Sequence, residues 1–157
     1  MQFINIEYAA SRTEVLSTLR DNEFVNQGVR FEEGRGIPHM RIKEKKNGKI
    51  NLTCELMGKA TKDNGFLVGT YFSGKLTEEG GVTRLKGIIT TAPIYHAGLI
   101  ALLGVFIYQC FYIGGFSVIP PILLVFDYFL FREEFRKQGY IKRYLYRAAR
   151  KIREKKK

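Results

Sequence analysis

Histidine, cysteine and acidic residues are the side chains best suited to chemistry, and this chain holds few of them in useful arrangements. The two histidines, His39 and His96, have no Cys, Asp or Glu at the spacing of a metal-ligand set. The acidic pairs Glu32–Glu33 and Glu78–Glu79 are adjacent residues beside glycines, which is typical of solvated turns. No glycine-rich phosphate loop with a lysine is present. The sequence therefore predicts no metal site, no cofactor and no catalytic residue, and it favours a non-enzymatic protein.

The other feature with a possible chemical role is the concentration of positive charge in the last residues of the sequence. Residues 132–157 carry a net charge of +9 out of the +11 of the whole chain. Four apolar residues of this segment recur at the 4-3-4 spacing of one helix face, namely Ile141, Leu145, Ala148 and Ile152. The pattern predicts a basic amphipathic helix. The basic residues that we assign to a lipid-binding surface on it are Lys142, Arg143, Arg147, Arg150, Lys151 and Arg153.

Three partners fit such a basic helix. Anionic lipid headgroups rank first, because each nearby basic residue contributes about 1 kcal/mol of attraction. A plain topology signal with a solvated end ranks second. Nucleic acid or ribosome contact ranks well behind, although basic and aromatic residues interleave here.

The elements before this tail are mostly strands. Alternating patterns predict strands at 3–8, 40–46, 50–56, 66–77 and 82–91. Ser11 and Glu14 form a capping box that starts a helix over residues 12–25, and residues 28–38 are expected to form a loop. Asn47-Gly48 predicts a tight hairpin, because both residue types tolerate positive φ. We expect an α+β domain at residues 1–92, with a small antiparallel sheet in the order β-α-β-β-β-β.

An apolar stretch follows this domain. Ile94 to Ile113 gives twenty residues without a charge, or about 30 Å of helix. Gly114 to Ser117 is expected to break it before a second apolar segment. The pattern predicts a two-helix transmembrane hairpin at residues 93–131, with helices at 94–113 and 117–131 that span the bilayer or re-enter it. Because basic flanks stay cytoplasmic, we expect an integral membrane protein with both termini cytoplasmic and a basic tail at 132–157.

Asp127 is the one charged residue of the apolar stretch. A carboxylate in a membrane segment is costly and usually faces a partner or water. Five residues separate it from Arg132, so the favoured interpretation is that it reaches the interface or pairs with that arginine. A packing contact with another membrane subunit is the second interpretation, and a proton relay is a distant third.

One glycine-rich motif carries a resemblance. Its residues are Phe72, Gly74, Leu76, Gly81, Thr83, Leu85 and Gly87, followed at once by apolar helices. In this motif and the hairpin the chain resembles a loose group of uncharacterised small bacterial membrane proteins. The resemblance implies an N-terminal β-rich cytoplasmic domain with a C-terminal hairpin in a bacterial plasma membrane, and no activity. Gly74 and Gly87 are interpreted as leaving room on the sheet for aromatic neighbours or the anchor.

The order of the first elements is also similar to the opening of helix-grip lipid-binding domains. Those domains need about seven strands and a long closing helix. This chain offers five strands and assigns its C-terminal apolar segments to the bilayer, so a full ligand cavity is not expected.

Three hypotheses for the function follow. The first is a membrane-anchored interaction module, a subunit or accessory protein of a membrane complex, whose partners are anionic lipids, another membrane protein or further copies of the chain. The second is a binder of lipid or a small apolar ligand, in a groove between the sheet and the helix at 12–25. An enzyme ranks last.

Overall fold

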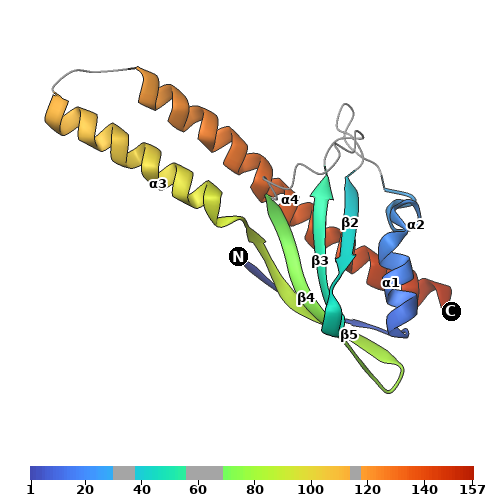
Figure 1. The fold of residues 1–157 in the computed structure, drawn as a ribbon. Helices are drawn as coiled ribbons and strands as arrows, with labels where there is room; N and C mark the ends of the chain where they lie inside the picture. The colour runs from blue at the N-terminus through green and yellow to red at the C-terminus, as the bar shows by residue number, and fades with distance from the viewer. Residues whose placement is uncertain (30–37, 56–68, 114–117) are drawn as a thin grey trace.

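The computed structural model of this chain describes residues 1–29, 38–55, 69–113 and 118–157. In chain order its elements are β1 (Gln2–Tyr8), α1 (Arg12–Arg20), α2 (Asn22–Asn26), β2 (His39–Glu44), η1 (Lys46–Gly48), β3 (Lys49–Glu55), β4 (Thr70–Glu79), β5 (Val82–Thr91), α3 (Pro93–Tyr108), η2 (Gln109–Ile113) and α4 (Ile119–Lys155). Figure 1 shows a sheet crossed by α4, with α3 and the first part of α4 projecting together beyond it.

The sheet is antiparallel throughout, with five strands in the order β1-β5-β4-β3-β2. The α+β class and the antiparallel sheet predicted from the sequence are therefore present. Asn47 and Gly48 adopt φ values of 68° and 73° at the turn between β2 and β3, which confirms the predicted hairpin. The strand expected at 66–77 runs from Thr70 to Glu79, and residues 66–68 lie outside the described residues.

The helix expected at 12–25 is two helices, so that prediction was wrong in one respect. Ser11 caps α1 by accepting a hydrogen bond from the Glu14 backbone N–H (3.4 Å), as the capping box predicts. Asp21 then ends α1 and caps α2, its Oδ1 accepting from the Phe24 backbone N–H at 2.9 Å. The second cap allows the chain to turn between the helices. Most of the expected loop, residues 30–37, lies outside the described residues.

The core lies between one face of the sheet and the helices α1 and α4. Its α4 side consists of Ile141, Tyr144, Leu145, Ala148 and Ile152, all at most 1% exposed. Two tyrosines also link α4 to other elements by donating to carbonyl oxygens. Tyr8 Oη donates to the Leu145 carbonyl at 3.2 Å, and Tyr144 Oη donates to the Leu19 carbonyl at 2.9 Å. The apolar face of the basic helix therefore packs on the sheet and closes the domain, contrary to the expectation of a separate tail.

The two glycines of the sequence motif face each other on β4 and β5, on the inner face of the sheet. A Cβ on Gly74 would lie 2.4 Å from Phe72 Cζ, and one on Gly87 would lie 2.6 Å from the same atom. The absence of side chains at both positions leaves room for the aromatic ring of Phe72, as interpreted from the sequence.

The predicted transmembrane hairpin is wrong, because α3 is too short and α4 is apolar over only its first part. The α-helix α3 has 16 residues and ends at Tyr108, where the backbone widens into the π-helical turn η2. In α4 the apolar residues give way to charged ones from Arg132 onward. Among the described residues no helix joins the length and the apolarity that crossing a bilayer requires. The integral-membrane assignment, the bacterial plasma membrane location and the cytoplasmic placement of both termini lose their basis with it. The expected break at residues 114–117 lies outside the described residues.

Candidate functional site

The groups singled out for chemistry do not assemble into a reactive centre in the described part of the chain. No cluster of three or more His, Cys, Asp or Glu side chains that could hold a metal ion occurs there. His39 is exposed at the start of β2, and His96 is exposed on α3 with its ring edge-to-face with Phe131 at 5.4 Å. Glu78 accepts from the Arg12 backbone N–H at 3.1 Å, and Glu32–Glu33 lies outside the described residues.

The two cysteines are separate free thiols in different surroundings. Cys54 is buried on the inner face of β3, and burial raises its pKa to about 12. A thiol that keeps its proton is a poor nucleophile, so the surroundings of Cys54 suit a packing role. Cys110 is exposed in η2.

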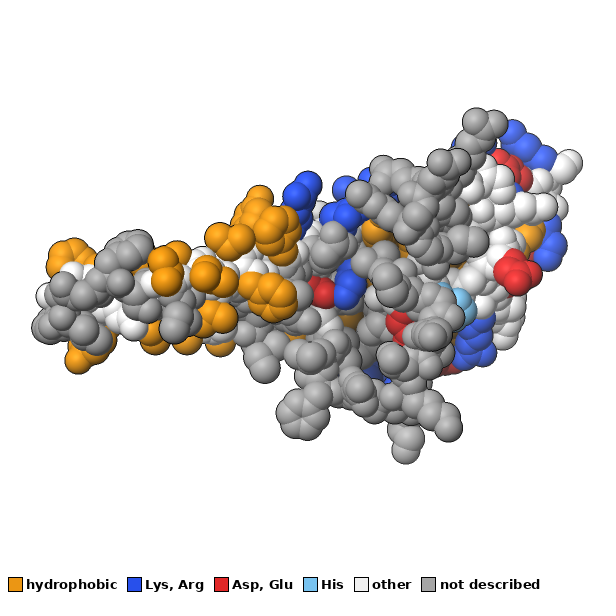
Figure 2. Space-filling view, turned by 90° about the horizontal axis from the view of Figure 1, so that it is seen from above, with side chains coloured by type: hydrophobic (Ala, Val, Ile, Leu, Met, Phe, Trp, Pro, Cys, Tyr) orange, Lys and Arg blue, Asp and Glu red, His pale blue; other side chains and the backbone are white. Residues whose placement is uncertain are grey.

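The feature that stands out is the apolar arm, defined here as residues 93–131. Thirteen of the eighteen large hydrophobic side chains that are exposed in the described part of the chain lie between Ile100 and Phe129. Ile100 is 70% exposed and Phe111 is 80% exposed. Figure 2 shows these side chains gathered on the projecting arm, whereas Lys, Arg, Asp and Glu side chains gather on the body.

Within the described residues, one side of α3 is covered by α4. Half-buried apolar residues recur at Leu99, Leu102 and Phe106, the 3-4 spacing of one helix face, and α3 packs alongside α4. The faces turned away from α4 carry exposed apolar residues such as Ile100, Val105 and Tyr108. A helix that is apolar on every face is normally buried. The arm therefore has the surface of a buried element, and the described residues leave that surface exposed.

A buried polar cluster fixes the base of the arm to the sheet. Glu134 of α4 is 4% exposed, and its Oε2 accepts from the Thr70 backbone N–H at 2.6 Å. Thr70 Oγ1 donates to the Glu134 carbonyl at 2.9 Å and lies 3.1 Å from Thr91 Oγ1. Gln138 Nε2 donates to the same Thr91 hydroxyl at 2.9 Å, and Lys137 pairs with Glu134. We call these five residues the junction cluster; they join α4 to β4 and β5 where the arm begins.

Gly69 is part of the same arrangement. A Cβ at this position would lie between 2.1 and 2.6 Å from the carboxylate atoms of Glu134. The Gly69 carbonyl also accepts from the Ala92 backbone N–H at 2.9 Å, immediately before α3 begins. The absence of a side chain at residue 69 therefore lets Glu134 reach the start of β4.

The sequence interpretation missed the junction cluster, although a signal for it existed. Glu134 and Gln138 continue the stripe of Ile141, Leu145 and Ala148 backwards at spacings of 4 and 3. Two polar residues in line with an apolar face indicate polar partners on the element that the face covers. Those partners, Thr70 and Thr91, lie far away along the chain.

The six basic residues assigned to lipid contact are divided between solvent and the protein itself. Arg147 Nη1 donates to Asn26 Oδ1 at 3.2 Å, and Lys151 Nζ lies 5.5 Å from the centre of the Phe24 ring. Arg150 pairs with Glu154, while Lys142, Arg143 and Arg153 are exposed. Their contact with lipid stays a prediction. Asp127 belongs to α4, but its side chain lies outside the described residues.

Comparisons with protein-family models, with curated proteins and with solved structures found no match for this chain.

Proposed function

We propose that this protein is a non-enzymatic interaction module that joins a larger assembly through its apolar arm. The proposal rests on the apolar side chains of α3 and α4 that are exposed. They lie on the faces where the two helices do not contact each other. Contiguous exposed apolar surface beyond a few hundred Å² marks an interaction site on most proteins. Burial of such surface contributes about 25 cal/mol per Å², so a partner that covers the arm gains substantial stability.

The partner that fits best is another apolar helix or helix pair. A pair of helices such as the arm offers ridges and grooves into which a second pair can pack, as in a four-helix bundle. Phe111, Phe126 and Phe129 are all more than half exposed and provide aromatic anchors of the kind that dominate binding energy. The partner helices would come from a second copy of this chain or from a different subunit.

A lipid surface is the second candidate partner. The width of the apolar surface favours it, because a partner that covers one side would leave the opposite side of the arm in water. Arg132 is exposed where the apolar residues of α4 end, at the position where a headgroup phosphate would lie if the arm dipped into acyl chains. Such contact needs only an arm that rests in a lipid surface.

The hypothesis that the protein binds a small apolar ligand has less support. The side chains between the sheet and α1 include Leu16, Leu19, Leu52, Cys54 and Leu85, and all of them are buried in the common core. These side chains themselves occupy the space between the sheet and α1. The arm is therefore the better basis for a function.

The test compares charged substitutions on the arm with a matched change on the domain. Ile100→Glu with Phe126→Glu places carboxylates on both helices of the arm, whereas Phe3→Glu makes the same change at a 79% exposed position of β1. Light scattering would follow the mass of each full-length chain after removal of detergent. We expect the wild type and Phe3→Glu to assemble and the arm variant to stay monomeric.

Two further results decide between the candidates. A wild-type chain that stays monomeric and floats with phospholipid vesicles would favour lipid over helices. A wild-type chain that neither assembles, floats nor brings down a partner from its own cell extract would contradict the proposed function.

A further inference from the structure

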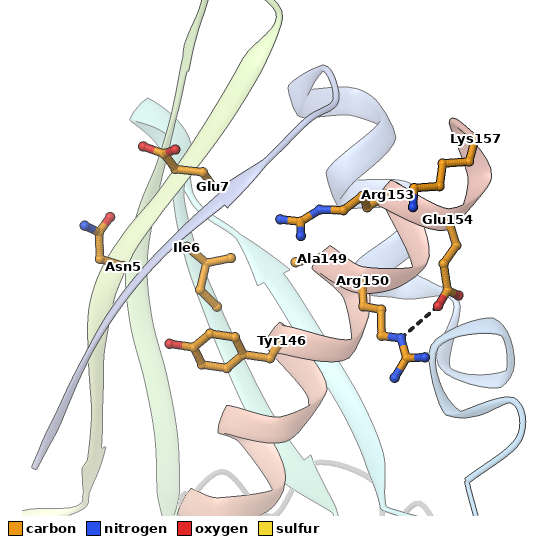
Figure 3. Close-up of a pocket in the computed structure, with 9 residues that line it drawn as sticks. All are labelled: Asn5, Ile6, Glu7, Tyr146, Ala149, Arg150, Arg153, Glu154 and Lys157. Atoms are coloured by element: carbon orange, nitrogen blue, oxygen red, sulfur yellow. Dashed lines mark hydrogen bonds and ion pairs between the residues drawn. The ribbon is translucent and has the colours of Figure 1, made fainter.

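A groove runs along β1, at the end of the molecule away from the arm. This open groove of about 740 Å³ is lined by Asn5, Ile6 and Glu7 of β1. Its other wall is the last part of α4, with Tyr146, Arg150, Arg153, Glu154 and Lys157. Figure 3 shows the side chains of Tyr146 and Arg153 directed from α4 toward the strand. Because successive strand residues point to opposite faces, a groove that touches three consecutive residues follows the edge of the strand.

The edge of β1 offers backbone groups for pairing. In the described part of the chain β1 pairs with β5 alone, from Gln2 opposite Ile89 to Tyr8 opposite Thr83. The register is continuous, and the strand contains no proline. Alternate N–H and C=O groups of such a strand point away from its neighbour and can pair with another chain.

The opposite edge of the sheet, at β2, is partly occupied by a side chain. At β2 the Asn22 side chain accepts from the Met40 backbone N–H at 2.7 Å and donates to the Met40 carbonyl at 2.9 Å. The amide thus imitates a neighbouring strand at that residue and occupies the edge. No such side chain bonds to the outer edge of β1 among the described residues. Among the described residues, the β1 edge is therefore more accessible than the β2 edge at Met40.

The charge of the groove selects the kind of strand that would pair there. Its two acids are already neutralised, since Arg84 Nε donates to Glu7 at 2.9 Å and Arg150 Nε donates to Glu154 at 2.8 Å. Arg153 and Lys157 are exposed and have no ion pair within the described residues. The wall of α4 that faces the strand therefore has an excess of positive charge.

We propose that this groove binds an extended acidic peptide segment of a partner protein, which adds to the sheet as a sixth strand beside β1. Backbone pairing provides the affinity, and acidic side chains on the face turned to α4 pair with Arg153 and Lys157. The groove and the apolar arm are separate surfaces, so this inference does not depend on the function proposed for the arm.

The probe is a short fluorescein-labelled peptide in which valine and glutamate alternate, titrated with the full-length chain in mild detergent and followed by anisotropy. We expect the acidic peptide to bind and to slow hydrogen exchange at the β1 amides. Arg153→Glu with Lys157→Glu should weaken binding by about tenfold or more, because both cations of the wall are reversed. Lys142→Glu, an exposed change on α4 outside the groove, should alter it by about twofold or less.

Two matched peptides separate strand pairing from simple charge attraction. One carries lysine in place of glutamate, and the other has N-methyl groups on two adjacent central residues, which block both edges of the peptide strand. Both should lose binding. Equal binding by either of them, or equal loss in the Lys142→Glu chain, would overturn the proposal. So would β1 amides that become protected by higher concentrations of this chain alone, because the edge would then serve a second copy.

Discussion

At the level of single residues, the position of the arm depends on Glu134. Its carboxylate accepts from the buried Thr70 N–H at 2.6 Å, and its main-chain carbonyl accepts from the Thr70 hydroxyl. Glu134→Ala should lower the free energy of unfolding by about 1–3 kcal/mol, because a buried donor is left unpaired. Glu134→Gln keeps an acceptor oxygen and should lose less. Urea denaturation followed by circular dichroism would measure both.

Glu154→Ala is the matched control for this prediction. Glu154 lies on the same helix and pairs with Arg150, but 49% of its side chain is exposed. An exposed pair of this kind contributes about 0.5 kcal/mol or less. If Glu134→Ala costs no more than the control, the junction cluster does not hold the arm to the sheet.

The buried thiol of Cys54 makes stability depend on pH in the alkaline range. Its pKa is raised by burial from 9.0 to about 12, with Lys137 opposing and Glu134 adding to the shift. Between these values the unfolded chain has lost the proton and the folded chain keeps it, so stability falls as the pH rises. The fall is at most about 1.4 kcal/mol per pH unit. Burial also raises the pKa of Tyr8 and Tyr144 above 10.

Cys54→Ala isolates the thiol in the window from pH 9 to pH 10, because the tyrosines contribute equally to the wild type and to the variant. The variant is expected to be less stable at pH 7 but to lose about 1 kcal/mol less than the wild type across that window. Denaturation curves at the two pH values would show this. Parallel losses in the two proteins would mean that the thiol titrates normally in the folded state.

At the level of elements, sequence patterns correctly predicted those elements whose conformation depends on neighbouring residues in the chain. The alternation of Ile50, Leu52 and Cys54 and the Asn47-Gly48 turn fix a strand and a hairpin without reference to the rest of the chain. The stripe from Ile141 to Ile152 was also correctly predicted as one helix face. The sequence could not show whether lipid or the sheet covers it, because the same pattern suits either environment.

Gly139 lies inside the continuous helix α4. α4 runs without a break from Ile119 to Lys155, and a Cβ at residue 139 would meet no atom within 4 Å. Gly139→Ala should therefore raise the free energy of unfolding by about 0.5–1 kcal/mol, since glycine costs entropy in a helix. Gly87→Ala should lower it by about 1–3 kcal/mol, because its Cβ would lie 2.4 Å from the Ser73 carbonyl oxygen. Thermal unfolding measures both, and a loss of stability in Gly139→Ala would mean that the helix requires flexibility there.

At the level of the whole molecule, the position of the apolar stretch was predicted correctly, but the prediction that it spans a membrane was wrong. Counting uncharged residues from Ile94 treats the stretch as one helix, whereas the backbone changes from α to π after Tyr108. The junction cluster was out of reach for a similar reason. It depends on Thr70 and Thr91 meeting Glu134, and only the assembled sheet brings these residues together.

The separation of the arm from the core leads to the last prediction. Every buried hydrophobic side chain of the described core lies outside residues 93–131, so the domain should fold without the arm. The rings of His96 and Phe131 lie 5.4 Å apart, which means that a short Gly/Ser linker can replace residues 98–129. We expect this shortened chain to unfold cooperatively, with a free energy of unfolding within about 1–2 kcal/mol of the full chain.

Leu145→Ala is the control that shows whether the assay detects a loss of core packing. Leu145 is fully buried in α4, so this change should lower the free energy of unfolding by about 2–5 kcal/mol. A shortened chain that melts without cooperativity would mean that the arm is part of the fold, and its exposed apolar surface would then need an explanation other than a partner.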